Sequence, residues 1–184
     1  MTKGTQSQVG LWKHKRPKVE EWVKYCLDGE KREQILDFVE WAREMGFKHK
    51  IHSTNNSGHN VFYNNEYMCR MMIHAKESPT LLYWEITPCL IHLDLYTETI
   101  NNEDLGNIPW KPNYCIHKKQ PNKTLINNTC NACSIKGVDR LAFGEDFVQC
   151  CVSFPAVENP DNAELERIKR LLILEKEARD NIRA

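Results

Sequence analysis

The fold is decided by the stretch GFKHKIHSTNNSGHNVFYNNEYMCRMMIH, residues 46–74, in which the hydrophobic period of the chain changes from helical to strand-like. Phe47 and Ile51 bound an alternating run with lysines at every second position, which is typical of a half-buried strand. Asparagine-rich turns separate this run from two further extended runs, with no helical pattern between them. The sequence therefore predicts an antiparallel β-meander with strands at 47–51, 59–63 and 67–74.

Two more extended runs follow the meander and enlarge the predicted sheet. They are separated by Pro88, which has no backbone N–H to donate to a neighbouring strand. We expect strands at 80–87 and 89–96, and hence a sheet of about five antiparallel strands.

The residues before this stretch predict a helical hairpin. Pro17 suits the first turn of a helix, and Asp28-Gly29 breaks that helix before a second apolar stripe runs from Ile35 to Met45. Gly46 suits the left-handed position that ends a helix. The apolar residues of the first helix recur at helical spacing and are Val19, Trp22, Val23, Cys26 and Leu27.

The chain after the sheet begins with little periodicity. Residues 97–136 are rich in proline and asparagine, and so long a loop in a compact domain indicates a function, disorder or an external clamp. A hairpin is predicted at 140–154, and a final helix begins at the capping-box residues Asp161 and Glu164. The buried side of this helix is expected at Leu165, Ile168, Leu172 and Ile182.

These patterns predict one α+β globule in which the helical hairpin packs on the antiparallel meander. A Cys-rich, zinc-ribbon-like module and a terminal helix complete it, and 184 residues suffice for such a core. We expect a basic flexible tail at 1–16, the α+β domain at 17–110, and the Cys-rich module with the C-terminal helix at 111–184.

Charge and hydropathy narrow the classes of partner. Acidic and basic residues balance at 25 each, so no global field requires nucleic acid or a membrane. Basic residues are concentrated in segments 3–18 and 111–140, which leaves contact with RNA or DNA open as an alternative. The chain shows neither the apolar run of a signal peptide nor that of a membrane span, so we expect a cytoplasmic protein.

The cysteines of the C-terminal third have the spacing of a metal site. Zinc prefers four thiolate or imidazole ligands, and Cys130 and Cys133 form a Cys-x2-Cys pair that presents two sulfurs on one turn. Cys150 follows past a hairpin, at the distance of the second ligand pair of a zinc ribbon, and its side chain diverges from that of Cys151. We therefore expect a structural zinc ion. The predicted ligands are Cys130, Cys133, Cys150 and either Cys115 or His117.

Two other interpretations of these cysteines remain open. The chain has 8 cysteines, and free cysteines in a reducing compartment are often buried small residues. A redox role for Cys130 and Cys133 would place the pair after a strand and at the start of a helix, where the dipole lowers a thiol pKa. The sequence predicts neither neighbour.

The C-terminal third also resembles a group of known proteins. The Cys-x2-Cys pair is followed by Gly144-Glu145-Asp146-Phe147, by Cys150 three residues later, and by Asn159-Pro160-Asp161 before the last helix. This arrangement is similar to a C-terminal module of small uncharacterised bacterial proteins. The resemblance implies that the cysteines act as one unit, and it implies no activity.

Three further groups of residues are candidates for a ligand or metal site. His92 and Asp94 lie two apart in a predicted strand and so share a face, where His92 is either a base or ligand oriented by Asp94 or part of a solvent-facing row. A second group either lines an apolar pocket or belongs to the core, and comprises Met68, Met71, Met72, Tyr83 and Trp84. A third group of histidines across a predicted hairpin comprises His49, His52 and His59.

Together these features predict a metal-stabilised domain that binds an unidentified small molecule or protein. Four protein ligands would leave no open zinc position for a substrate water, which favours binding over catalysis. A thiol- or metal-dependent enzyme and a nucleic-acid-binding module remain alternatives. The sequence contains no Gly-rich phosphate loop, G-x-S-x-G elbow or H-E-x-x-H motif, which argues against common nucleotide and hydrolase chemistries.

Overall fold

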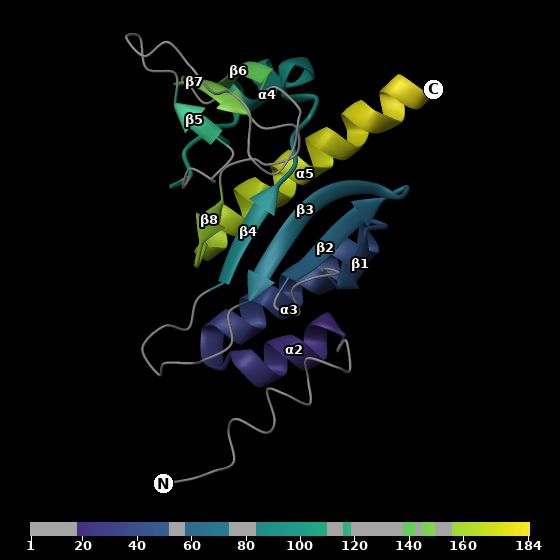
Figure 1. Cartoon of the computed structure of the whole chain (residues 1–184), viewed down its shortest axis with the longest axis vertical. Helices are drawn as coiled ribbons and strands as arrows, with labels where there is room; N and C mark the ends of the chain where they lie inside the picture. The colour runs from purple at the N-terminus through teal and green to yellow at the C-terminus, as the bar shows by residue number, and fades with distance from the viewer. Residues whose placement is uncertain are drawn as a thin grey trace, which may run out of the picture. The chain divides into compact units, whose positions relative to one another are not determined.

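The structure of the chain is a computed structural model that describes residues 18–51, 58–73, 84–109, 116–118, 138–142, 145–149 and 156–184. The chain divides into two compact units, Met1–Glu85 and Ile86–Ala184. This division lies upstream of the boundary at residue 110 that we expected. Each unit contains helices and antiparallel strands, which confirms the α+β class (Figure 1).

The first unit begins with the predicted hairpin of helices α2 (Val19–Cys26) and α3 (Gly29–Glu44). The Glu21 carboxylate supports the first turn of α2 by accepting the backbone N–H of Lys18 at 3.2 Å. Helix α3 ends as expected, because Gly46 has a φ of 82°, in the left-handed region that favours glycine. The buried residues of the two helices are Val19, Trp22, Val23, Cys26, Ile35, Phe38, Val39 and Ala42.

The predicted meander follows and is confirmed. It consists of the antiparallel strands β1 (Lys48–Ile51), β2 (Gly58–Tyr63) and β3 (Glu66–Ile73). Asn64 and Asn65 connect β2 to β3 with φ angles of 48° and 66°. Asparagine tolerates positive φ better than most residues, so this pair permits a tight two-residue hairpin turn.

Helix α2 packs on this meander, as the hydrophobic pattern predicted. It contacts both α3 and β3 (Figure 1), and the indole N–H of Trp22 donates to the Ile73 carbonyl at 3.3 Å. Phe38 of α3 and Met68 of β3 are fully buried. Burial of each such side chain contributes about 1.5–3 kcal/mol, so the apolar layer stabilises the unit far more than this single hydrogen bond.

The larger sheet contains five strands in the order β1-β2-β3-β4-β8, which confirms the expected size of the sheet. Strand β4 (Trp84–Pro88) spans the division between the units, and β8 (Val157–Glu158) is its neighbour in the second unit. Pro88 is the last residue of β4, where a missing N–H is tolerated, and does not separate two long strands.

The second unit ends in helix α5 (Asn162–Arg183), which the sequence predicted. Its capping box is formed as expected: Asp161 accepts the N–H of Glu164 at 2.8 Å, and Glu164 accepts the N–H of Asp161 at 2.8 Å. The expected burial of Ile182 is wrong, because the buried stripe of α5 ends at Arg179. Within the described part of the chain a membrane-spanning helix is absent, since even α5 mixes apolar with charged residues.

Replacing Asp161 with alanine is expected to lower the free energy of unfolding by about 1 kcal/mol, because the cap of α5 loses its side-chain acceptor. Urea denaturation followed by circular dichroism measures this change. Asp161→Asn is the matched control, since asparagine keeps an acceptor and is expected to retain most of the stability. Equal losses for alanine and asparagine would show that the side-chain cap is not the cause.

A three-stranded antiparallel sheet with the order β5-β7-β6 also belongs to the second unit. Its strands are β5 (Ile116–Lys118), β6 (Val138–Ala142) and β7 (Glu145–Gln149). Ala142 pairs with Glu145 at the closed end of the β6–β7 hairpin. The antiparallel pairing of β6 with β7 agrees with the hairpin predicted at 140–154, of which residues 143–144 and 150–154 lie outside the described residues.

The predicted strand at 89–96 is wrong. The segment contains a turn and the 3-10 helix η1 (Leu93–Leu95), and helix α4 (Thr97–Asn102) follows where a loop was expected. Ile91 and Leu95 suggested the alternation of a strand, but both are exposed. The buried residues recur instead at spacings of three and four, which is the helical period: Leu90, Leu93, Tyr96 and Ile100.

Candidate functional site

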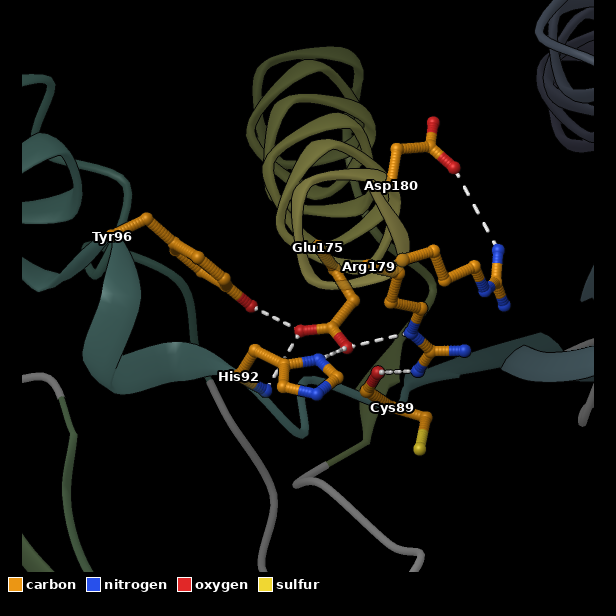
Figure 2. Close-up of polar contacts among 7 residues, drawn as sticks. Cys89, His92, Tyr96, Glu175, Arg179 and Asp180 are labelled. Atoms are coloured by element: carbon orange, nitrogen blue, oxygen red, sulfur yellow. Dashed lines mark hydrogen bonds and ion pairs between the residues drawn. The ribbon is translucent and has the colours of Figure 1, made fainter.

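A fully buried carboxylate of the second unit is surrounded by polar partners (Figure 2). Glu175, on α5, accepts four hydrogen bonds from three residues that surround it. Four is the number of lone-pair positions that two carboxylate oxygens offer, so the acceptor capacity of Glu175 is used completely. The donors are Nδ1 of His92 at 3.0 Å, the backbone N–H of His92 at 3.0 Å, the hydroxyl of Tyr96 at 2.7 Å and Nε of Arg179 at 2.8 Å.

Arg179 balances the charge of this carboxylate. It lies one helical turn after Glu175 on the same face of α5, and only 2% of its side chain is exposed. Its guanidinium also donates to the carbonyl oxygen of Cys89 at 3.3 Å. A buried ion pair of this kind persists only when its remaining donors and acceptors are satisfied, and these contacts meet that condition.

The segment after β4 positions the other two partners. His92 and Tyr96 lie four residues apart on either side of η1, so the turn of the backbone directs both side chains towards α5 (Figure 2). Leu93, between them, is buried and anchors η1 in the core. The hydroxyl of Thr97 donates to the Leu93 carbonyl at 3.0 Å and supports the start of α4.

The contact with Glu175 fixes the tautomer of His92. A carboxylate only accepts hydrogen bonds, so Nδ1 of the imidazole carries the proton and Nε2 keeps a free lone pair in the neutral ring. Nε2 makes no hydrogen bond with the described residues, and it lies on the ring edge turned away from Glu175 (Figure 2). With 29% of its side chain exposed, His92 can meet a molecule from solvent.

Tyr96 remains a donor throughout the physiological pH range. Burial raises the pKa of its hydroxyl, and the nearby Glu175 charge and the hydrogen bond to it raise that pKa further. The hydroxyl therefore stays protonated and holds one oxygen of Glu175. Its role is to position the carboxylate, since its ring is buried.

The residues of the predicted ligand pocket belong to both compact units. His92 is half-buried in the site, but its partner is Glu175 and not Asp94, which is exposed and shares no strand with it. Met71 and Trp84 are fully buried core residues of the first unit. Tyr83 lies outside the described residues.

The predicted metal ligands lie almost entirely outside the described residues. This holds for all four cysteines, namely Cys115, Cys130, Cys133 and Cys150, while His117 is described only by its backbone in β5. Among the side chains that are described, no group of three could hold a metal ion. Burial raises the pKa of the Cys26 thiol to about 12, so this described cysteine is a core residue and not a reactive thiolate at neutral pH.

Glu175 and Arg179 were missed by the sequence analysis. The available signal was a pair of opposite charges four residues apart on the side of the last helix that also holds Leu172 and Ala178. Such a pair is ordinarily read as solvent-exposed. However, this charged pair lies within the apolar stripe of the helix. That position indicates that both charges are buried and need partners from elsewhere in the chain.

Comparisons of the chain with protein-family models, with curated proteins and with solved structures find no match. The resemblance of the C-terminal third to small bacterial proteins stays a prediction. The site is therefore interpreted from its own contacts.

Proposed function

We propose that the protein is a ligand-binding domain in which Nε2 of His92 accepts a hydrogen bond from the bound molecule. One observation carries this proposal: Nδ1 of His92 lies 3.0 Å from the fully buried Glu175 carboxylate. This contact leaves Nε2 as the acceptor on a partly exposed ring. Ligands of matching chemistry carry an O–H or N–H donor, as carboxylic acids, phenols, alcohols and amides do.

The rigidity of the imidazole supports binding. Ordering a mobile side chain on association costs about 0.5–1.5 kcal/mol. His92 is held in advance at Nδ1 and at its backbone N–H, both by Glu175. Glu175 is in turn held by Tyr96 and Arg179, so the ligand does not have to order the ring.

The same contacts favour binding over catalysis. A histidine oriented by a carboxylate is also the arrangement of a general base, but catalysis requires a second reacting group beside Nε2. The hydrogen bonds of the described residues place no such group there. Recognition requires only the oriented acceptor.

The test is a screen of small carboxylic acids, phenols and amides by ligand-observed NMR. Fragments that bind the wild type are expected to bind His92→Phe about 5-fold more weakly, because a hydrogen bond at a preformed acceptor contributes about 1 kcal/mol. Asp94→Asn is the matched control, since Asp94 is exposed and close in sequence to His92. Fragments with equal affinity for the wild type and His92→Phe, or a wild type that binds none, contradict the proposal.

A structural zinc ion in the segment 115–150 is a second proposal, and it concerns stability. The register of the small sheet supports it: Ile116 and Val138 are both paired with Gln149. Ile116, Val138 and Gln149 therefore lie at one end of this sheet, and they are the described residues nearest in sequence to Cys115, Cys133 and Cys150. A tetrahedral zinc site needs four ligands close together, and this pairing of the neighbouring strand residues is compatible with that requirement.

A further inference from the structure

Two histidines of the first unit have buried ring nitrogens without hydrogen-bond partners. His59, on β2, is 2% exposed, and its Nε2 has no partner among the described residues. His49, on β1, has no described partner for either ring nitrogen. A buried polar group without a partner is tolerated more easily when it is neutral, so these rings are placed where a positive charge is strongly disfavoured.

The strand register places the two rings on one face of the meander. His49 pairs with Val61 and His59 pairs with Ile51, so the histidines are diagonal neighbours across the β1–β2 ladder. The residue of β3 opposite His59 is Met71, which carries no charge. Arg70 of β3 pairs with Asn60 and therefore lies on the opposite face.

The helices supply the charged groups that act on this histidine pair. Arg43 of α3 forms an ion pair with Glu20 of α2. Arg43 disfavours a positive charge on His49, whereas Glu20 favours one on both His49 and His59. One oxygen of Glu20 pairs with Arg43 and the other is buried without a partner among the described residues, so neither is bonded to either imidazole of the pair. The four groups thus form one cluster built from α2, α3, β1 and β2.

Burial is the main cause of the lowered pKa values of both histidines. It lowers the pKa of His49 to about 4, with a further lowering by Arg43, and it lowers the pKa of His59 to about 4, with a further lowering by His49. The pKa of Glu20 is raised by burial but lowered overall by a backbone hydrogen bond and by Arg43, so the ionised form of Glu20 is favoured.

The sign of the effect on stability follows from these values. An unfolded chain protonates its histidines near pH 6.5, whereas the folded unit does so only near pH 4. Between these limits the unfolded chain binds more protons, so stability is constant above about pH 6.5 and falls as the pH decreases towards 4.

We infer that the first unit contains an acid-sensitive switch, in which protonation of His59 and His49 releases the β1–β2 pair from helices α2 and α3. Two positive charges would then lie side by side on one buried face and next to Arg43, with Glu20 as the only opposing charge in the cluster. Opening of the strand pair exposes both rings to water and removes this conflict.

Amide hydrogen exchange on the full chain, corrected for the intrinsic pH dependence of exchange, tests this inference. Between pH 7 and pH 4.5 the protection of β1 and β2 is expected to fall on the order of 50-fold from His59 alone, while α5 in the second unit serves as an internal control. A His49→Gln/His59→Phe variant is expected to keep its protection at pH 4.5. Equal losses in wild type and variant would overturn the switch.

NMR titration of the wild-type imidazoles keeps the inference testable if this variant does not fold. His59 is expected to remain neutral at pH 5 and to become protonated only as β1 and β2 lose protection. An ordinary midpoint near pH 6.5 in the folded unit, without loss of protection, would contradict the inference.

Discussion

Replacement of Arg179 by methionine is expected to lower the free energy of unfolding by about 3–5 kcal/mol, one of the largest effects of a single substitution in this chain. Methionine fills much of the volume of the arginine stem but leaves the Glu175 carboxylate without its buried cation. Tyr96 and His92 still donate to the carboxylate, but a neutral hydroxyl and a neutral amide do not replace a full charge in a buried site. Equilibrium urea denaturation measures the loss.

The double variant Glu175→Gln/Arg179→Met identifies the cause. Glutamine keeps a carbonyl acceptor for Tyr96 while removing the charge, so the double variant is expected to be more stable than Arg179→Met alone by about 2 kcal/mol. Arg179→Lys provides a second comparison. Lysine keeps the positive charge but lacks the second guanidinium N–H group, which donates to the Cys89 carbonyl. A double variant no more stable than Arg179→Met would show that lost packing, and not an unpaired charge, causes the loss.

Loss of metal from a Cys130→Ser/Cys133→Ser variant is the second large effect that we expect. Elemental analysis of protein purified without chelator should find about one zinc per wild-type chain, and none in the variant. A structural zinc contributes on the order of 10 kcal/mol of folding free energy, so the variant is expected to lose the cooperative melting of the segment that carries the cysteines.

Cys151→Ser is the matched control for this experiment. Cys151 is adjacent to Cys150 in sequence, and only one of the two side chains can point towards a shared ion, so the control variant is expected to keep its zinc. A wild type that is free of metal and still melts cooperatively would refute the zinc proposal. The cysteines would then be interpreted as buried residues, like Cys69 and Cys89.

Most of the fold of the first unit could be predicted, because each of its elements has a strong local signal. The helices carry apolar residues on one face, and Gly46 and Asn64-Asn65 occupy backbone positions with positive φ. The segment 89–96 could not be predicted correctly, because its apolar residues fit two periods at once. Alternation predicted a strand, and only tertiary burial of Leu93 and Tyr96 selects the helical one.

The candidate site was predicted only in part, since His92 was selected but its partner was not. Asp94 was chosen because it is near in sequence, whereas Glu175 is 83 residues away. Contacts over such a separation depend on how elements pack, which the periodicity of a single segment does not encode. The burial of His49 and His59 in the first unit was also not predicted. The alternation of lysine and histidine before His59 is typical of an exposed strand, and the burial depends on contacts with other elements.

The separation between His92 and Glu175 also bears on how the chain matures during synthesis. At typical translation rates, Glu175, which is 83 residues after His92, is added roughly 4–17 s after His92 has been made. During that interval His92 and Tyr96 have no Glu175 to bind and the Cys89 carbonyl has no Arg179, whereas every residue of the first unit has already been synthesised. The nascent second unit therefore lacks the contacts of its buried ion pair for seconds, a window in which a chaperone can bind it and in which a ribosome stall would favour misfolding.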